Sequence, residues 1–233
     1  MKKLNLFLSL ILILVMGTAA SAQTVDDVIS KATAAIGGQS AIDAVKSIRM
    51  TMTGTLMGGE SSMEVLIVKP NCKMIKSTIQ GMEIITATNG TDYWRSQLGQ
   101  VTDMTASARE QFGSSFNQYS ADGIADLIGN GTFTYSGKEV VNGISADVVK
   151  GAFTGSGPVS MYFDPTGLPF RMLMYNDEGD LDMYITDYRD VGGVKIAYKF
   201  ESIVKGSSLM VMEITKAEAN VDIDLSIFDK PAQ

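Results

Sequence analysis

The chain has 233 residues, of which 45% are hydrophobic and 19% charged, a composition that predicts a folded protein rather than a disordered one. Its net charge of −7 argues against nucleic acid as a partner. There is no histidine and a single cysteine, Cys72, which excludes His-dependent triads, imidazole-ligated zinc and an internal disulfide. A binding protein or an unusual enzyme remains.

The first 22 residues have the pattern of a cleavable export signal. Lys2 and Lys3 precede an apolar run, Leu4–Met16, and the small-residue site Ala20-Ser21-Ala22 follows. Because this run is shorter than the roughly 20 residues of a spanning helix, cleavage is favoured over a membrane anchor. We therefore predict a signal peptide over residues 1–22 and one mature domain over residues 23–233, with no lipidation cysteine at its start and a periplasmic location.

Short amphipathic helices are expected around the start and middle of the mature domain. Thr24 and Asp27 form a capping pair before apolar residues at helical spacing, and Gly37-Gly38 ends that pattern. A second short helix is expected from Ser40. Two more are expected near the middle of the chain, over Thr105–Phe112 and Ser120–Ile128. Helices of this kind are typical covers for a sheet.

From Ile48 onward the apolar period changes to two, which is typical of strands. Turn-forming pairs such as Gly58-Gly59, Pro70-Asn71 and Asn89-Gly90 separate the first strands. In the second half, strands are expected at Phe133–Val140, Ile144–Gly151, Val159–Phe163, Leu168–Tyr175, Leu181–Tyr188, Val194–Ile203 and Leu209–Ala217. Ten or eleven sequential strands with few helices predict a mainly β fold: a single curved antiparallel sheet forming an unclosed β-barrel.

Methionine is the unusual chemical feature of this sequence. Of 15 methionines, two lie in the expected signal peptide, and many of the rest occupy alternating strand positions: Met50, Met52, Met63, Met161, Met172, Met174, Met183, Met210 and Met212. Methionine is flexible and polarisable, so a surface rich in it can repack around ligands of variable shape such as acyl chains. The alternative is an ordinary core. A sheet with so few covering helices favours a partly covered apolar concavity.

Several segments resemble one family of envelope proteins. They are Val65–Asn71, Ile84–Trp94, Tyr162–Pro169, Thr186–Lys195 and the closing Phe228-Asp229-Lys230-Pro231. In this order they are similar to the strands and turns of the LolA/LolB-like superfamily, the periplasmic outer-membrane lipoprotein-sorting carriers. The resemblance covers most of the mature chain.

The resemblance implies an unclosed β-barrel whose helical lid covers a hydrophobic cavity. That cavity would receive the acyl chains of lipoproteins or other lipids for transfer toward the outer membrane, from an inner-membrane donor to an outer-membrane acceptor. It implies a monomer without covalent chemistry or a cofactor. The carriers place an arginine that holds the lid before the proline of Val65–Asn71, where this chain has Lys69. A lysine is a point charge rather than a bidentate fork.

The expected cavity-lining residues combine the alternating methionines with nearby apolar positions. They are Met50, Met52, Met63, Val65, Ile67, Trp94, Phe170, Met172, Met174, Met183 and Ile185. For Trp94, packing in the sheet core is an equal alternative.

Two other functions stay open at the level of sequence. One is a periplasmic sensor or envelope-assembly module that receives a protein segment on the same concave surface. The other is a lipid-modifying enzyme, which is less favoured because no catalytic or metal-binding set of residues is visible. Lipid retained by the purified protein would indicate a carrier, whereas a retained polypeptide would indicate an interaction module.

Overall fold

The computed structural model describes residues 23–115, 123, 128–129, 131–153, 157–176 and 179–232. Within them, strands dominate. They are β1 (Ser47–Leu56), β2 (Gly59–Val68), β3 (Cys72–Ile79), β4 (Met82–Thr88), β5 (Tyr93–Gln97), β6 (Gln100–Asp103), β7 (Gly131–Val141), β8 (Ile144–Phe153), β9 (Pro158–Phe163), β10 (Pro169–Met174), β11 (Leu181–Val191), β12 (Val194–Val204) and β13 (Ser207–Ala219).

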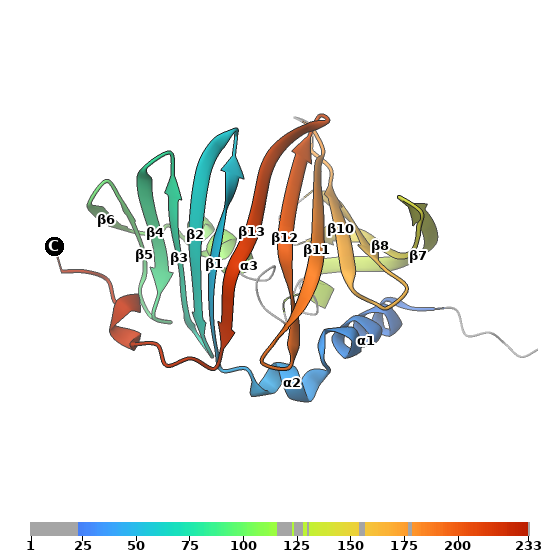
Figure 1. Cartoon of the computed structure of the whole chain (residues 1–233), viewed down its shortest axis with the longest axis horizontal. Coiled ribbons are helices and arrows are strands. Elements are labelled where there is room, and N and C mark those ends of the chain that lie inside the picture. The colour runs from blue at the N-terminus through green and yellow to red at the C-terminus, as the bar shows by residue number, and fades with distance from the viewer. Residues whose placement is uncertain are drawn as a thin grey trace, which may run out of the picture.

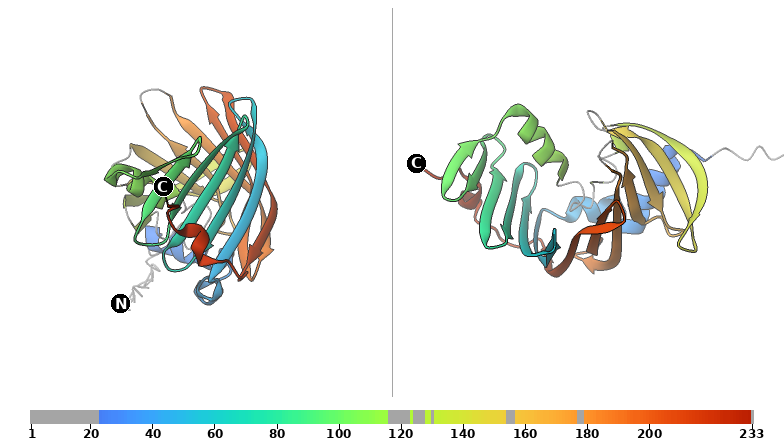
Figure 2. Two further views of the ribbon diagram at one scale, coloured as in Figure 1. Left: turned by 90° about the vertical axis from the view of Figure 1, so that its left-hand side faces the viewer. Right: turned by 90° about the horizontal axis from the view of Figure 1, so that it is seen from above.

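These strands form a single antiparallel sheet in the described part of the chain. Its thirteen strands follow the order β6-β5-β4-β3-β2-β1-β13-β12-β11-β10-β9-β8-β7. The pairing of β1 with β13 joins the N-terminal and C-terminal halves, with Ile48 opposite Ala219. The sheet is strongly curved (Figures 1 and 2), and its edge strands β6 and β7 are not paired with each other. The prediction of one unclosed antiparallel barrel is confirmed.

The strand count exceeds the expected ten or eleven, and β6 is the clearest omission. This strand follows β5 through the two-residue turn Leu98-Gly99, in which Leu98 has a φ of 52°. A left-handed backbone at that position usually selects Asn, Asp or Gly, so the sequence carries little turn signal there.

Two of the helices cover one end of the sheet. Helix α1 (Val25–Ile36) begins with the predicted capping box, in which the backbone N of Asp27 donates to Oγ1 of Thr24 over 3.2 Å. It ends at Gly37, where a Cβ would lie 2.4 Å from the carbonyl oxygen of Gly193 in the β11–β12 turn. Helix α2 (Gln39–Ala44) follows directly. Figure 1 shows both at the lower end of the strands.

A third helix lies on the concave side. Helix α3 (Ala106–Ser115) matches the expected helix over Thr105–Phe112, and buried Phe112 belongs to the same core cluster as the inner face of the sheet. The other expected helix, Ser120–Ile128, lies outside the described residues except for Gly123 and Ile128. None of the helices in the described ranges is both long and apolar enough to cross a membrane.

The convex face of β3–β5 is covered by the C-terminal segment. The 3₁₀-helix η2 (Leu225–Phe228) places the fully buried Phe228 against this face, and Nε1 of Trp94 donates to the carbonyl oxygen of Phe228 over 2.9 Å. Leu66, Met74, Ala87 and Ile223 are the other buried members of the cluster. The molecule thus has a second apolar layer outside the barrel, separate from the inner core.

Candidate functional site

Most methionines of the mature chain converge on the inner face of the sheet. Ten of them belong to the two core clusters on this face: Met50, Met52, Met63, Met104, Met161, Met172, Met174, Met183, Met210 and Met212. Nine of these are strand residues, and strand alternation places them on one side. The other three are Met74 on the convex face and Met57 and Met82, which are exposed.

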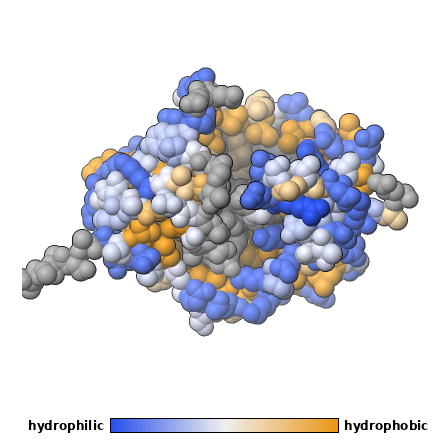
Figure 3. Space-filling view, turned by 180° about the vertical axis from the view of Figure 1, so that it is seen from behind, coloured by the Kyte–Doolittle hydropathy of each residue, from blue (hydrophilic) through white to orange (hydrophobic). Residues whose placement is uncertain are grey.

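Apolar side chains of the inner face are more deeply buried toward one end than toward the other. We call the end that carries α1 and α2 the lower end and the opposite end the upper end. Toward the lower end Val194 and Ile48 are 0% and 3% exposed. Toward the upper end Met63, Met174 and Met210 are only half-buried. In Figure 3, which views the molecule from behind, apolar surface lies above and below the middle of the face.

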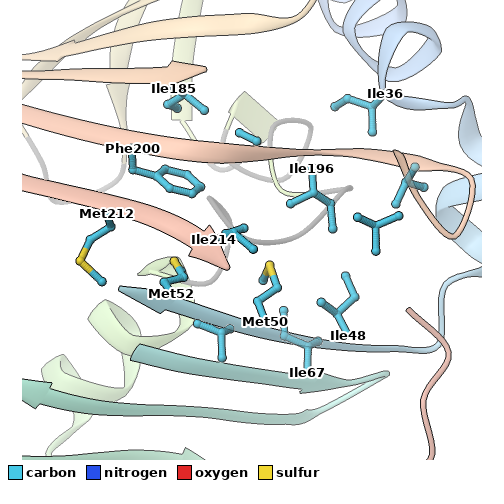
Figure 4. Packing of buried hydrophobic residues seen from close by; sticks show 14 of the residues in the cluster. Ile36, Ile48, Met50, Met52, Ile67, Ile185, Ile196, Phe200, Met212 and Ile214 are labelled. Atoms are coloured by element: carbon cyan, nitrogen blue, oxygen red, sulfur yellow. The ribbon is translucent and has the colours of Figure 1, made fainter. Parts of the chain in front are cut away.

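The middle of the inner face is a tightly packed junction between the two halves of the chain. Figure 4 shows Met50 and Met52 of β1 facing Phe200 of β12 and Met212 and Ile214 of β13. The sheet registers place Met52 opposite both Met63 and Ile214. This level of the inner face is therefore built from apolar side chains, of which Met50, Met52 and Met212 are flexible and unbranched.

An ionic cluster fastens α1 to the sheet. Asp147 of β8, 2% exposed, accepts from Nζ of Lys138 at 2.8 Å, from the hydroxyl of Tyr135 at 3.0 Å and from Nζ of Lys31 at 3.3 Å. Lys31 belongs to α1, and the other two belong to β7. A bulge between Tyr135 and Gly137, where Gly137 has a φ of 94°, shifts the register so that Lys138 pairs with Asp147.

The cluster makes stability depend on pH. Burial raises the pKa of Asp147, but hydrogen bonds from Lys138, Tyr135 and Lys31 outweigh this effect and hold the pKa below its ordinary value. A carboxyl with a lowered folded-state pKa stabilises the fold above its unfolded pKa, about 3.9, and loses that contribution as pH falls through the folded value. We expect Asp147→Asn to be less stable at pH 7 and to lose less stability on acidification. Urea unfolding between pH 7 and 2 measures this, and parallel curves for variant and parent would contradict it.

Lys69 lies against the other covering helix. Its Nζ donates to the carbonyl oxygen of Ile42 in α2 over 3.2 Å, and its backbone N donates to the carbonyl oxygen of Lys46. The carbonyl oxygen of Ile42 also accepts from the backbone N of Val45 over 3.3 Å, so Lys69 adds a second, cationic donor at the C-terminal end of α2, where positive charge is favourable. The residue singled out by the family resemblance therefore does contact a covering helix.

The structure brings nine of the eleven expected lining residues together. They are Met50, Met52, Met63, Val65, Ile67, Met172, Met174, Met183 and Ile185. Met50, Met52 and Val65 are fully buried, whereas Met63, Met172 and Met174 are half-buried.

Trp94 and Phe170 are not part of this surface, and the expectation for them is corrected. Trp94 is opposite Ala87 in the sheet and packs under Phe228 on the convex side. Phe170 packs with Tyr162, Ala146 and Val148 in another outer cluster. The expected lining set also lacked Phe200, Met212 and Ile214, although Met212 is one of the alternating methionines and Ile214 continues the same pattern in β13.

The fold is shared with several solved structures. No family model and no curated protein matches the chain. A DUF1329 family protein from Desulfovibrio piger has a TM-score of 0.60 at 14% identity, covering 88% of this chain and 97% of that one. A LolA superfamily protein from Nitrosomonas europaea has a TM-score of 0.59 at 14% identity, with 90% and 99% covered. A domain from Vibrio parahaemolyticus that is described as an outer membrane lipoprotein-sorting protein domain has a TM-score of 0.57 at 14% identity, covering 88% of this chain and 95% of that one.

These likenesses define the class of the fold. It is the unclosed β-barrel with covering helices found in LolA superfamily and lipoprotein-sorting proteins, over nearly nine-tenths of the chain. The resemblance drawn from the sequence is confirmed at this level.

Proposed function

We propose that this protein is a periplasmic carrier that binds the acyl chains of lipoproteins or other lipids against its inner face and transfers them toward the outer membrane. The observation that carries the proposal is the methionine-rich inner face, part of which stays half-buried at the upper end. A contiguous apolar surface inside a hollow is a common form of binding site for an apolar ligand.

The composition of the inner face supports variable acyl chains rather than one rigid ligand. Methionine side chains have three rotatable bonds and adapt to irregular shapes at small energetic cost. The lipoprotein-sorting name of a structural neighbour agrees with this ligand class. An inner-membrane donor and an outer-membrane acceptor would complete the route. The protein is then a binding protein and needs no catalytic group.

The proposed location rests on the N-terminal segment. A signal peptide over residues 1–22 would deliver a mature chain that begins at Gln23, one residue before the Thr24 cap of α1. The intact mass of the exported protein tests this directly, and a retained Leu4–Met16 segment would refute it.

Binding is tested with a fluorescent fatty-acyl probe added to the purified protein. A carrier should bind the probe with saturation, and unlabelled fatty acid should displace it. If the probe does not bind and the purified protein instead retains a polypeptide, the same surface serves a sensor or an envelope-assembly module.

Lys69→Ala is expected to speed release of a bound acyl probe while changing global stability little. The variant removes the bond from Nζ to the carbonyl oxygen of Ile42, so α2 is held less firmly and the lower end of the inner face becomes a second exit for the probe. Partly exposed charges contribute little to folding, so global stability should change little. Stopped-flow release rates and hydrogen exchange of residues 39–44 measure the effect.

The matched control for this experiment is Lys195→Ala, which removes an exposed lysine from β12. It should leave release unchanged. If Lys69→Ala and the parent have equal release rates and equal hydrogen exchange of residues 39–44, Lys69 has no role in holding α2 in place.

A further inference from the structure

Two large apolar side chains are almost fully exposed at the upper end of the sheet. Met57 is 75% exposed and Leu98 is 79% exposed, and each occupies the first position of a two-residue hairpin turn. A third, Met82, is 38% exposed and begins β4 directly after the β3–β4 turn. We call these three residues the rim.

The backbone conformation at these turns makes Met57 and Leu98 unexpected. Both have a φ of 52° and are followed by a glycine with positive φ. Hairpin turns of this kind select Asn, Asp or Gly at the first position, because other side chains clash with the backbone there. A large apolar residue in this place gains nothing from burial and is disfavoured by the turn itself.

The turns at the other end of the strands follow the ordinary preference. The β7–β8 turn is Asn142-Gly143 and the β11–β12 turn is Gly192-Gly193, all with positive φ. At the upper end the β3–β4 turn uses Gln80 and the β12–β13 turn uses Lys205, each with a φ of 50° but a polar side chain. The favoured turn chemistry is therefore kept at these lower-end turns and departed from at all four of these upper-end turns, of which only those of Met57 and Leu98 carry an apolar side chain at the first position.

The spacing of the rim favours a fluid partner over a protein surface. The turns of β1–β2, β3–β4 and β5–β6 are successive hairpins of one sheet, so neighbouring tips are separated by two strand spacings, roughly 10 Å. A stable protein interface needs a contiguous, closely packed patch. Single apolar side chains standing apart at loop tips instead match a lipid surface, which closes around each one.

The rim is also continuous with the inner face. Met82 is opposite Ile79, and Ile79 is opposite Ser61, two residues before Met63 on the same strand. Strand alternation therefore puts Met82 on the same side as Met63. This is the end at which the inner face is half-buried, opposite the end covered by α1 and α2.

We propose that the rim of Met57, Met82 and Leu98 docks the upper end of the barrel on a lipid bilayer surface. The docking is apolar rather than electrostatic, because the protein is acidic and Glu83 at the β3–β4 tip is already paired with Lys76. It extends the proposed function by placing the upper, less deeply buried end of the inner face at the bilayer, from which an acyl chain enters or leaves.

The test uses co-sedimentation with phosphatidylcholine vesicles, in the full chain and in the form that begins at Gln23, so that any contribution of residues 1–22 is separated. The double variant Met57→Asn, Leu98→Asn should bind vesicles at least about tenfold more weakly, since two apolar insertions are lost. Its melting temperature should not fall, because Asn suits both turns better. Weaker vesicle binding without a lower melting temperature would show that Met57 and Leu98 dock the protein on the membrane rather than stabilise the fold.

Gln80→Asn is the matched control, since it improves a neighbouring turn without touching the rim. It should bind vesicles as the parent does. The proposal is overturned if the parent does not bind, if the double variant binds equally well, or if binding needs anionic phosphatidylglycerol and disappears in high salt.

The experiments distinguish a failure of the membrane-docking proposal from a failure of the carrier proposal. If the rim alone is correct, the parent binds vesicles but no acyl probe in solution. If the carrier function alone is correct, the parent binds the probe but not vesicles. When both proposals are correct, the double variant still binds the acyl probe in solution but no longer binds vesicles as the parent does.

Discussion

Replacing Met50 by aspartate is expected to unfold the domain, whereas replacing Met174 by aspartate is expected to leave it folded but unable to bind an acyl probe. Met50 is 0% exposed at the junction of the two halves of the sheet. A carboxylate there has no partner and costs several kcal/mol, a large part of the 5–15 kcal/mol by which domains are stable. Met174 is half-buried toward the upper end, where water can reach the charge.

Thermal melts and probe titrations decide between the two outcomes. Met172→Asp should behave as Met174→Asp does, because Met172 lies on the same face and is also half-buried. Met174→Leu is the control, since it keeps an apolar side chain of similar volume and should retain binding. If Met174→Asp unfolds as completely as Met50→Asp, the upper end is closed core and the proposed site is wrong.

Phe228→Ala is expected to lower the free energy of unfolding by about 3–5 kcal/mol without weakening the intrinsic affinity for the acyl probe. Phe228 is fully buried against Trp94, Leu66 and Met74 on the convex face. Its loss leaves a cavity under the C-terminal segment, on the other side of the sheet from the proposed ligand. Urea unfolding measures the first effect, and probe titration at low temperature measures the second.

The neighbouring Ile227→Ala serves as control for Phe228→Ala. Ile227 is 37% exposed, so its truncation should change stability by about 0.5 kcal/mol or less. A folded Phe228→Ala protein with abolished probe binding would mean that the outer cluster, rather than the inner face, holds the ligand.

The fold was predictable because its signals are local. Alternating apolar residues recur through both halves, and pairs such as Asn142-Gly143 and Gly192-Gly193 mark the hairpins. The Thr24 capping box and Gly37 fix the first helix in the same way. The strand β6 was missed because its turn, Leu98-Gly99, breaks the usual preference, and the same departure marks the rim.

The face on which a residue lies was less predictable than the strand that holds it. Phe170 is separated from Met172 and Met174 by steps of two, which predicts one common face. An irregularity in the β9–β10 register between Pro169 and Arg171 breaks this alternation, and Phe170 packs outside. Trp94 lies under a C-terminal segment 134 residues away in sequence. Neither local period nor propensity carries that information.

The contact that fastens the covering helix α1 to the sheet, through the ionic cluster around Asp147, was not predictable from local sequence either. Lys31 and Asp147 are 116 residues apart in sequence, and Lys138 reaches Asp147 only through the bulge at Gly137. By contrast, Lys69 was identified through its place in a family-like segment, and it does contact α2.

The carrier account is tested most directly by mass spectrometry of lipid extracted from the protein purified without detergent. The account predicts an acyl-containing lipid in a ratio approaching one per chain, and a much lower ratio in folded Met174→Asp protein. A parent protein that carries no lipid after purification, binds no acyl probe and instead retains a polypeptide would contradict it.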